Sequence, residues 1–91
     1  MYRVSDTVRS THGQDGAIVL DIRQGQMFNL NFVGSRILQL LKAGATELEI
    51  IREIGQEFRI SPDLARSDLL EFLRTLEQHQ LIENHDRNGK P

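Results

Sequence analysis

The chain has 91 residues, of which 38% are hydrophobic and 26% are charged, with a formal net charge of −2 and no cysteine. This length bounds it to one domain with a modest core, and the lack of cysteine excludes a disulfide framework and a thiolate metal site. The apolar runs are far shorter than the roughly 20 residues of a membrane helix, and no apolar signal core opens the chain, so we expect a cytoplasmic protein that does not contact membranes.

The first third of the chain predicts two strands. Residues 2–9 alternate weakly and predict an edge-like first strand, and residues 10–15 predict a polar loop. Residues 17–22 are rich in β-forming side chains and predict the second strand, with Asp21 on one face. The other face of this strand carries Ile18, Leu20 and Ile22.

A third strand is expected over residues 26–31. Residues 23–25 have the length and the glycine of a hairpin loop, and Phe28 and Leu30 lie on the core face of the returning strand. Nothing later in the chain resembles a strand that would pair with it, so we expect a sheet edge. An unpaired edge carries free N–H and C=O groups that can accept a strand from another chain.

Three helices are expected to follow this meander, the last of them running to about residue 80. Together these elements predict a single α+β domain over residues 1–83, a winged helix-turn-helix-like fold in which an N-terminal three-stranded antiparallel meander precedes three helices. The polar residues 84–91 are expected to form a disordered tail. The helix signals are Asn31 as the first N-cap, Gly44 as the end of that helix, Thr46 with Glu49 as a capping box, and Ser61 followed by Pro62 at the third start.

No residue pattern predicts catalysis. His12, His79 and His85 lack the spacing of a zinc site and have no acid placed as a partner base, so we expect surface positions without chemistry. The glycines do not form a phosphate-binding loop. We therefore predict a protein that is not an enzyme and that has no catalytic residue, metal site or cofactor.

The helical half of the chain is acidic. Residues 1–43 carry a net charge of +2, whereas residues 44–83 carry −5. A small winged-helix transcription factor is the alternative function, but acids outnumber bases on the third helix and would repel a phosphate backbone. A structural subunit that docks a basic partner is a further alternative. Its docking ridge would be Glu49, Glu53 and Glu57. These residues are also typical of a solvent-exposed helix face, on which Arg52 would offset the repulsion between them.

The third helix can instead form one wall of a groove whose other wall is the strand over residues 26–31. Leu64, Asp68 and Leu70 would then be available to a ligand peptide. Partial burial against the rest of the domain would account for leucine at positions 64 and 70 as well as peptide binding would. A flexible peptide loses ordering entropy when it binds, so a moderate affinity is expected.

Four segments in a fixed order carry a resemblance to a known family. They are VLDIRQGQMFNLN (19–31), VGSRILQLL (33–41), Ala45-Thr46, and DLLEFLRTLEQHQLI (68–82). Through them the chain resembles the PqqD-like family, the small domains that are also called RiPP recognition elements, over about residues 3–83. One departure is His79-Gln80, where many relatives carry a glycine.

The resemblance implies a non-catalytic domain that binds no DNA. Its members capture the leader segment of a ribosomally made precursor peptide and present the precursor to a modifying enzyme or leader peptidase. In the family the leader adds as a strand beside the third strand and packs against the third helix. The peptide-binding positions implied here are Gln26, Met27, Phe28, Asn29 and Leu30 on the strand and Leu64, Asp68 and Glu71 on the helix.

Asp68 matches an acidic position that recurs in such domains, so an Arg or Lys of the leader is expected to pair with it. The resemblance does not choose among pathways: a quinone-cofactor precursor, a lasso peptide or another modified peptide would all fit. An exposed edge can also pair with its own copy, which would give a homodimer.

Overall fold

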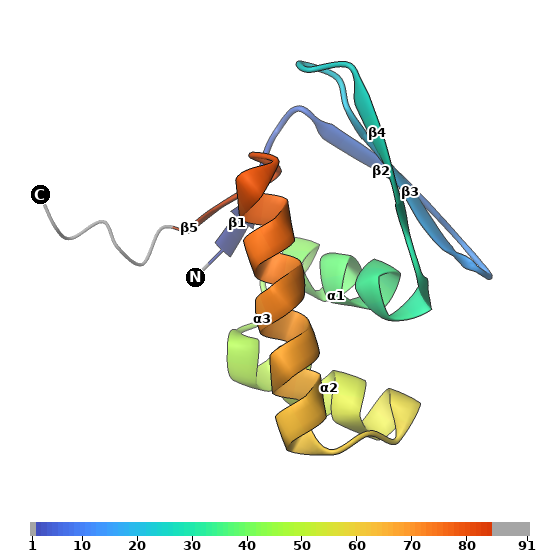
Figure 1. The fold of residues 1–91 in the computed structure, drawn as a ribbon, viewed down its shortest axis with the longest axis vertical. Coiled ribbons are helices and arrows are strands. Elements are labelled where there is room, and N and C mark those ends of the chain that lie inside the picture. The colour runs from blue at the N-terminus through green and yellow to red at the C-terminus, as the bar shows by residue number, and fades with distance from the viewer. Residues whose placement is uncertain (1, 85–91) are drawn as a thin grey trace, which may run out of the picture.

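The structure is a computed structural model that describes residues 2–84. It has an α+β fold in which a three-stranded antiparallel sheet precedes three helices and packs against the first of them (Figure 1). The tail expected over residues 85–91 lies outside the described residues. The elements are β1 (Tyr2–Val4), β2 (Val8–Gly13), β3 (Gly16–Asp21), β4 (Gln26–Leu30), α1 (Phe32–Lys42), α2 (Glu47–Phe58), α3 (Pro62–Gln78) and β5 (Ile82–Asn84).

The predicted three-stranded meander is confirmed as β2-β3-β4, but its first strand was placed wrongly. Residues 8–13 form β2, so most of the expected loop at residues 10–15 is strand. Ser10 and His12 lie on the inner face and are hydrogen-bonded there, which makes a polar sequence compatible with a strand. The register pairs His12 with Ala17 across the tight turn.

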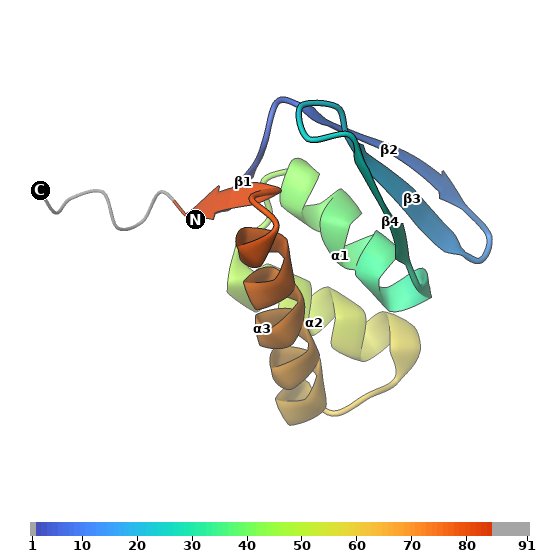
Figure 2. The ribbon, with the colours of Figure 1, turned by 45° about the horizontal axis from the view of Figure 1, so that its top comes forward.

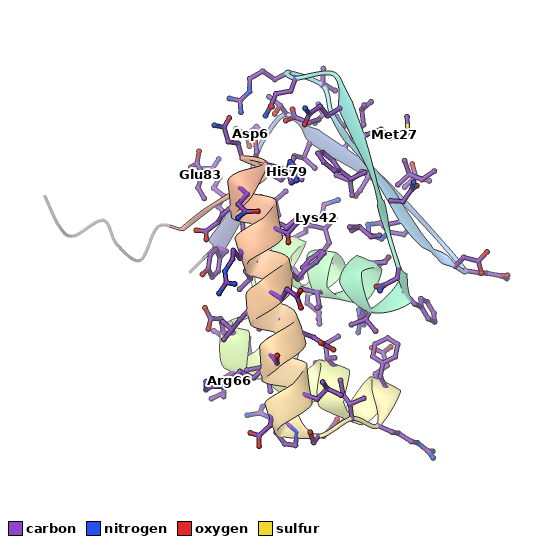
Figure 3. All side chains as sticks on the ribbon, in the orientation of Figure 1. Asp6, Met27, Lys42, Arg66, His79 and Glu83 are labelled. Atoms are coloured by element: carbon purple, nitrogen blue, oxygen red, sulfur yellow. The ribbon has the colours of Figure 1, made fainter. Side chains whose placement is uncertain are left out.

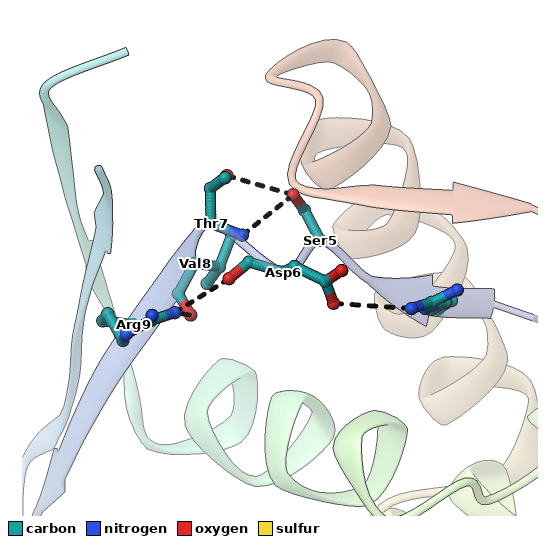
Figure 4. Close-up of polar contacts among 6 residues, drawn as sticks. Ser5, Asp6, Thr7, Val8 and Arg9 are labelled. Atoms are coloured by element: carbon teal, nitrogen blue, oxygen red, sulfur yellow. Dashed lines mark hydrogen bonds and ion pairs between the residues drawn. The ribbon is translucent and has the colours of Figure 1, made fainter. Parts of the chain in front are cut away.

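Residues 2–4 form a separate strand, β1, which pairs with β5 in a second, two-stranded antiparallel sheet. Tyr2 lies opposite Asn84, the first residue of the expected tail. The link to β2 is held by short-range polar contacts, including an Arg9 Nη1 donation to the Asp6 carbonyl at 2.8 Å (Figure 4). No local sequence pattern indicated β5, because its partner strand lies at the other end of the chain.

The caps of the three helices are as predicted. The side chain of Asn31 accepts from the Gly34 N–H, and Gly44 has a positive φ of 87° after α1. Both hydrogen bonds of the Thr46–Glu49 capping box form, and Ser61 caps α3 with proline in its first turn. Helix α3 ends at Gln78 rather than near residue 80, and Gln80 takes the left-handed conformation (φ 62°) at the turn where relatives are expected to carry glycine.

Helix α1 lies at the centre of the fold, with the sheet on one side and α2 and α3 on the other (Figure 2). Its inward residues meet side chains from every neighbouring layer in one apolar core. None of the described helices has the length and apolar character needed to cross a bilayer. The largest fully buried apolar side chains of this core are Val19, Ile37, Leu38, Ile50, Ile54, Leu69 and Leu73.

Asp21 organises the turn between β3 and β4. As expected, Asp21 and the aliphatic side chains of Ile18 and Leu20 lie on different faces of β3. The face that carries Asp21 is the buried one, and Asp21 is only 1% exposed. Its carboxylate accepts from Thr7 Oγ1 at 3.2 Å, from the Arg23 N–H at 3.1 Å and from Gln24 Nε2 at 2.9 Å. A buried carboxylate is tolerated here because these donors replace its hydration.

Asp21→Ala is therefore expected to lower the free energy of unfolding by about 2–3 kcal/mol, since it removes a buried acceptor and leaves several donors without a partner. Urea denaturation of the purified chain measures this change. Asp15→Ala, at an exposed turn position, is the matched control and should change the value by less than about 0.5 kcal/mol. An equal effect of the two substitutions would contradict the role given to Asp21.

Candidate functional site

The expected free edge of the sheet is confirmed in the described part of the chain. The strand order is β2-β3-β4, and β4 pairs only with β3, with Phe28 opposite Val19 and Met27 opposite Leu20. One side of the β4 backbone therefore faces no strand of the described residues. Phe28 and Leu30 point to the helical side of the sheet and pack against the core, as predicted.

A cavity of about 390 Å³ lies between β4 and α3, with the first turns of α1 as its floor. Its position beside the β4 edge gives a peptide strand both a backbone to pair with and a hollow for a side chain. We call this cavity and the adjoining β4 edge the groove. The cavity is lined by Asn29, Leu30, Asn31, Val33, Gly34, Ile37, Asp68, Glu71, Phe72 and Thr75.

Gly34 makes the floor of the cavity possible. A Cβ at this position would come within 3.1 Å of Cε1 of Phe72, so any larger residue would displace the ring. Without a side chain at Gly34, the Phe72 ring lies directly against α1. The cavity thus has an apolar base.

The rim of the cavity is polar and acidic. Asp68 is partly buried and Glu71 is exposed, and no basic residue lines the cavity. Two carboxylates with no neighbouring cation in the lining give the rim a negative potential. The groove is therefore suited to an apolar side chain that is accompanied by a basic one.

β4 and the turn before it contact His79, the residue that follows α3. The rings of Phe28 and His79 lie 4.8 Å apart between centroids, and Gln24 Nε2 donates to the His79 carbonyl at 3.3 Å. Figure 3 places His79 at the end of α3 nearest the sheet. His79 is exposed, as expected, but it has a structural role that the sequence did not indicate.

The structure brings together half of the sequence-predicted site residues. Asn29, Leu30, Asp68 and Glu71 line the cavity, and Phe28 contacts His79 beside it. The other three residues lie outside the lining. Gln26 is the first residue of β4, and Met27 points to the opposite face of the sheet with 66% exposure. Leu64 is 48% exposed one turn of α3 before Asp68.

The site prediction did not include several residues of the lining. Val33 and Ile37 on α1 and Phe72 on α3 are apolar residues at helical spacing, a pattern that does not distinguish a cavity lining from ordinary core. A glycine inside a helical pattern was the available signal for Gly34, since such a residue is unfavourable unless close packing requires it. The remaining additions to the lining are Asn31 and Thr75.

A second polar cluster lies between β2 and α1. His12 Nδ1 is 2.7 Å from Ser35 Oγ and His12 Nε2 is 3.1 Å from Ser10 Oγ, which also accepts from Lys42 Nζ at 2.6 Å. His12 is half-buried rather than a surface residue, and Ser35 is buried. The cluster joins the sheet to α1. In the part of the chain that the structure describes, no three His, Asp or Glu residues gather as metal ligands.

Comparison with known proteins gives one family and two solved structures. The family model described as coenzyme PQQ synthesis protein D (PqqD) matches residues 16–82. The structure of TbiB1 in complex with the TbiA(beta) leader peptide aligns with a TM-score of 0.84 and 36% identity, covering 90% of this chain and 95% of TbiB1. Among curated proteins, none matches.

The second solved structure is lasso peptide synthetase B1 complexed with the leader peptide. It aligns with a TM-score of 0.82, covering 91% of this chain and 98% of its own. At 19% identity, this likeness establishes a shared fold.

The cluster around His12 predicts a pH-dependent stability. Burial and then the charge of Lys42 lower the pKa of His12 below its ordinary value of 6.5. The unfolded chain therefore binds this proton more readily than the folded one, so the contribution of His12 is complete above pH 6.5 and is lost as the pH falls through its folded pKa.

We expect the free energy of unfolding to fall between pH 7.5 and pH 5.5, and to fall less in His12→Gln, which retains a polar side chain without the titration. Urea denaturation at the two pH values measures both. Thr11→Gln, at an exposed position of β2, is the control and should keep the pH dependence of the unmodified chain. An unaltered slope in His12→Gln would contradict the assignment.

Proposed function

Because the chain belongs to the PqqD family, we propose that it is a non-catalytic module that binds the leader segment of a ribosomally synthesised precursor peptide and presents the precursor to a modifying enzyme or leader peptidase. TbiB1, at 36% identity over nearly its whole length, was solved with a leader peptide, which supports the proposal. The binding mode we propose is strand addition to β4.

The observation that carries the proposal is the unpaired side of β4 beside the cavity. A peptide strand here would form main-chain hydrogen bonds along the edge, and these depend little on its sequence. Alternate side chains of that strand would point toward α3, where the cavity and its rim select among them. The strand positions Gln26, Met27, Phe28, Asn29 and Leu30 would bind through their backbone.

The rim of the cavity points to a leader with a basic residue. Asp68 and Glu71 stand on successive turns of α3 and lie in the lining with no cation beside them. A leader Arg or Lys on the α3 side would therefore meet uncompensated carboxylates. Leu64, one turn earlier on α3, would contact a leader that extends past the cavity.

DNA binding has little physical support. The exposed surface of α3 carries more acidic than basic residues, and the groove beside it is acidic as well. A phosphate backbone would be repelled by this surface. A second copy of the chain is the rival occupant of the β4 edge, and pairing of two copies would compete with the leader.

Asp68→Ala is expected to weaken leader binding about tenfold, which corresponds to about 1.4 kcal/mol, because the partner of the basic leader residue is lost. Isothermal titration with the leader of the precursor encoded beside this chain measures the affinity. Asp63→Ala, an acid in the first turn of α3 outside the cavity lining, is the matched control and should bind as the unmodified chain does.

The role of Asp68 and the proposed function are contradicted by different results. An unchanged affinity in Asp68→Ala would remove this carboxylate from the site. A failure of the unmodified, folded chain to bind the leader at all would overturn the proposed function.

A further inference from the structure

A second hollow, which we call the α2 hollow, lies on the outer side of α2, between this helix and the residues that lead into α3. Its volume is about 370 Å³. Helix α2 lies on the side of α1 away from the sheet (Figure 2), and the α2 hollow shares no residue with the groove. The α2 hollow is lined by Leu48, Ile51, Arg52, Gly55, Gln56, Ile60 and Pro62.

Gly55 leaves room in the α2 hollow that the fold itself does not require. A Cβ at this position would meet only the Ile60 carbonyl oxygen, at 3.4 Å, and Gly55 does not have a positive φ. Gly34, in contrast, is needed because the Phe72 ring lies against it. A glycine inside a helix disfavours that helix about fivefold relative to alanine. The missing side chain of Gly55 therefore suits a close approach from outside the domain.

Leu48 projects from the same side of α2. It is 63% exposed, although it is a large apolar side chain. Leu48 precedes Gly55 by about two helical turns, so the two residues lie on one face of the helix. This face therefore carries both a projecting leucine and a hollow in which a leucine side chain fits.

Two copies of this face are complementary when their α2 helices run antiparallel. In a two-fold dimer, a contact from residue i to residue j is repeated from j to i. Leu48 of each copy can thus lie over Gly55 of the other, and both exposed leucines become buried. The same face has no such match with a helix that lacks the leucine.

The charges of α2 also favour a second copy. Arg52 lies in the lining of the α2 hollow, which contains no acidic residue, and it forms no ion pair within the described part of the chain. Glu49 follows Leu48 directly and is exposed. When Leu48 lies over Gly55 of an antiparallel copy, Glu49 comes beside Arg52 of that copy, once on each side of the two-fold axis. The partner of this surface is therefore an apolar helix with an acidic residue, and α2 is such a helix.

We propose that two copies of the chain associate through antiparallel α2 helices, with Leu48 of each copy in the α2 hollow of the other and Arg52 of each beside Glu49 of the other. This dimer leaves both β4 edges open, so it differs from pairing at β4 and does not depend on the proposed function. The contact involves one 12-residue helix from each copy. The interface is therefore small, and the dimer is weak.

Analytical ultracentrifugation of the full chain, at concentrations from about 10 μM to about 1 mM, measures the association. We expect the unmodified chain to dimerise within this range. Leu48→Gln and Gly55→Leu should each weaken dimerisation about tenfold or more, because the first removes the inserted side chain and the second fills its place. Ile22→Gln is the control: Ile22 is 54% exposed beside the sheet, and this variant should dimerise as the unmodified chain does.

A charge exchange tests the proposed orientation without relying on loss of binding alone. Arg52→Glu and Glu49→Arg each bring like charges together in a homodimer, so each variant by itself should be monomeric. An equimolar mixture of the two variants should form a heterodimer, because every pair across the interface then joins opposite charges. Failure of the mixture to associate would contradict the antiparallel arrangement.

A chain that remains monomeric over the whole concentration range would overturn the inference, as would a dimer that Gly55→Leu leaves intact. A dimer that dissociates when the leader is added would be paired at β4 and would also overturn it. Absence of leader binding by a chain that dimerises through α2 would defeat only the proposed function.

Discussion

Strand pairing in the main sheet stops at β4, and this open backbone edge is the constraint on which the account depends. Each unpaired N–H and C=O along β4 must be satisfied by water or by another strand. Long unpaired edges are a liability in folded proteins and are usually blocked or shortened. Here the edge is five residues long and lies beside a cavity that α1 and α3 complete. An arrangement of this kind is suited to one guest strand rather than to open-ended pairing.

Several contacts outside the edge fix its geometry. Asp21 holds the turn before β4 through buried hydrogen bonds, and Phe28 contacts His79 at the end of α3. Gly34 lets Phe72 lie against α1, which determines the depth of the cavity. At the opposite edge of the sheet, His12 and Ser35 join β2 to α1. The position of β4 relative to α3 therefore depends on both the sheet and the central helix.

The sequence predicted those features that local chemistry determines. The caps at Asn31, Thr46 and Ser61 were found because each is a short-range pattern of side chain and backbone. The edge character of β4 followed from the absence of a later strand pattern. Both carboxylates of the acidic rim were among the predicted site residues. Asp68 was proposed as a groove residue from the helix pattern, and Glu71 came through the family resemblance.

Hydrogen bonds between residues far apart in the sequence could not be predicted from local sequence patterns. Ser10 and His12 look like loop residues until Ser35 and Lys42, on α1, are placed against them. The inward side of Asp21 is likewise decided by donors on the neighbouring loops. β5 was missed because its partner strand is at the other end of the chain, and Gly34 because its role depends on Phe72 from a different helix.

Binding of leader analogues that each carry one backbone N-methyl group tests most directly whether a peptide pairs with β4. A strand added to this edge donates only every second N–H to it, and each lost backbone bond costs about 1–3 kcal/mol. Strand addition to β4 predicts affinity losses of tenfold or more at alternate leader residues over a stretch that matches β4, and small losses at the residues between them. Losses without alternation would mean that the leader is held by its side chains alone, and they would contradict pairing at the β4 edge.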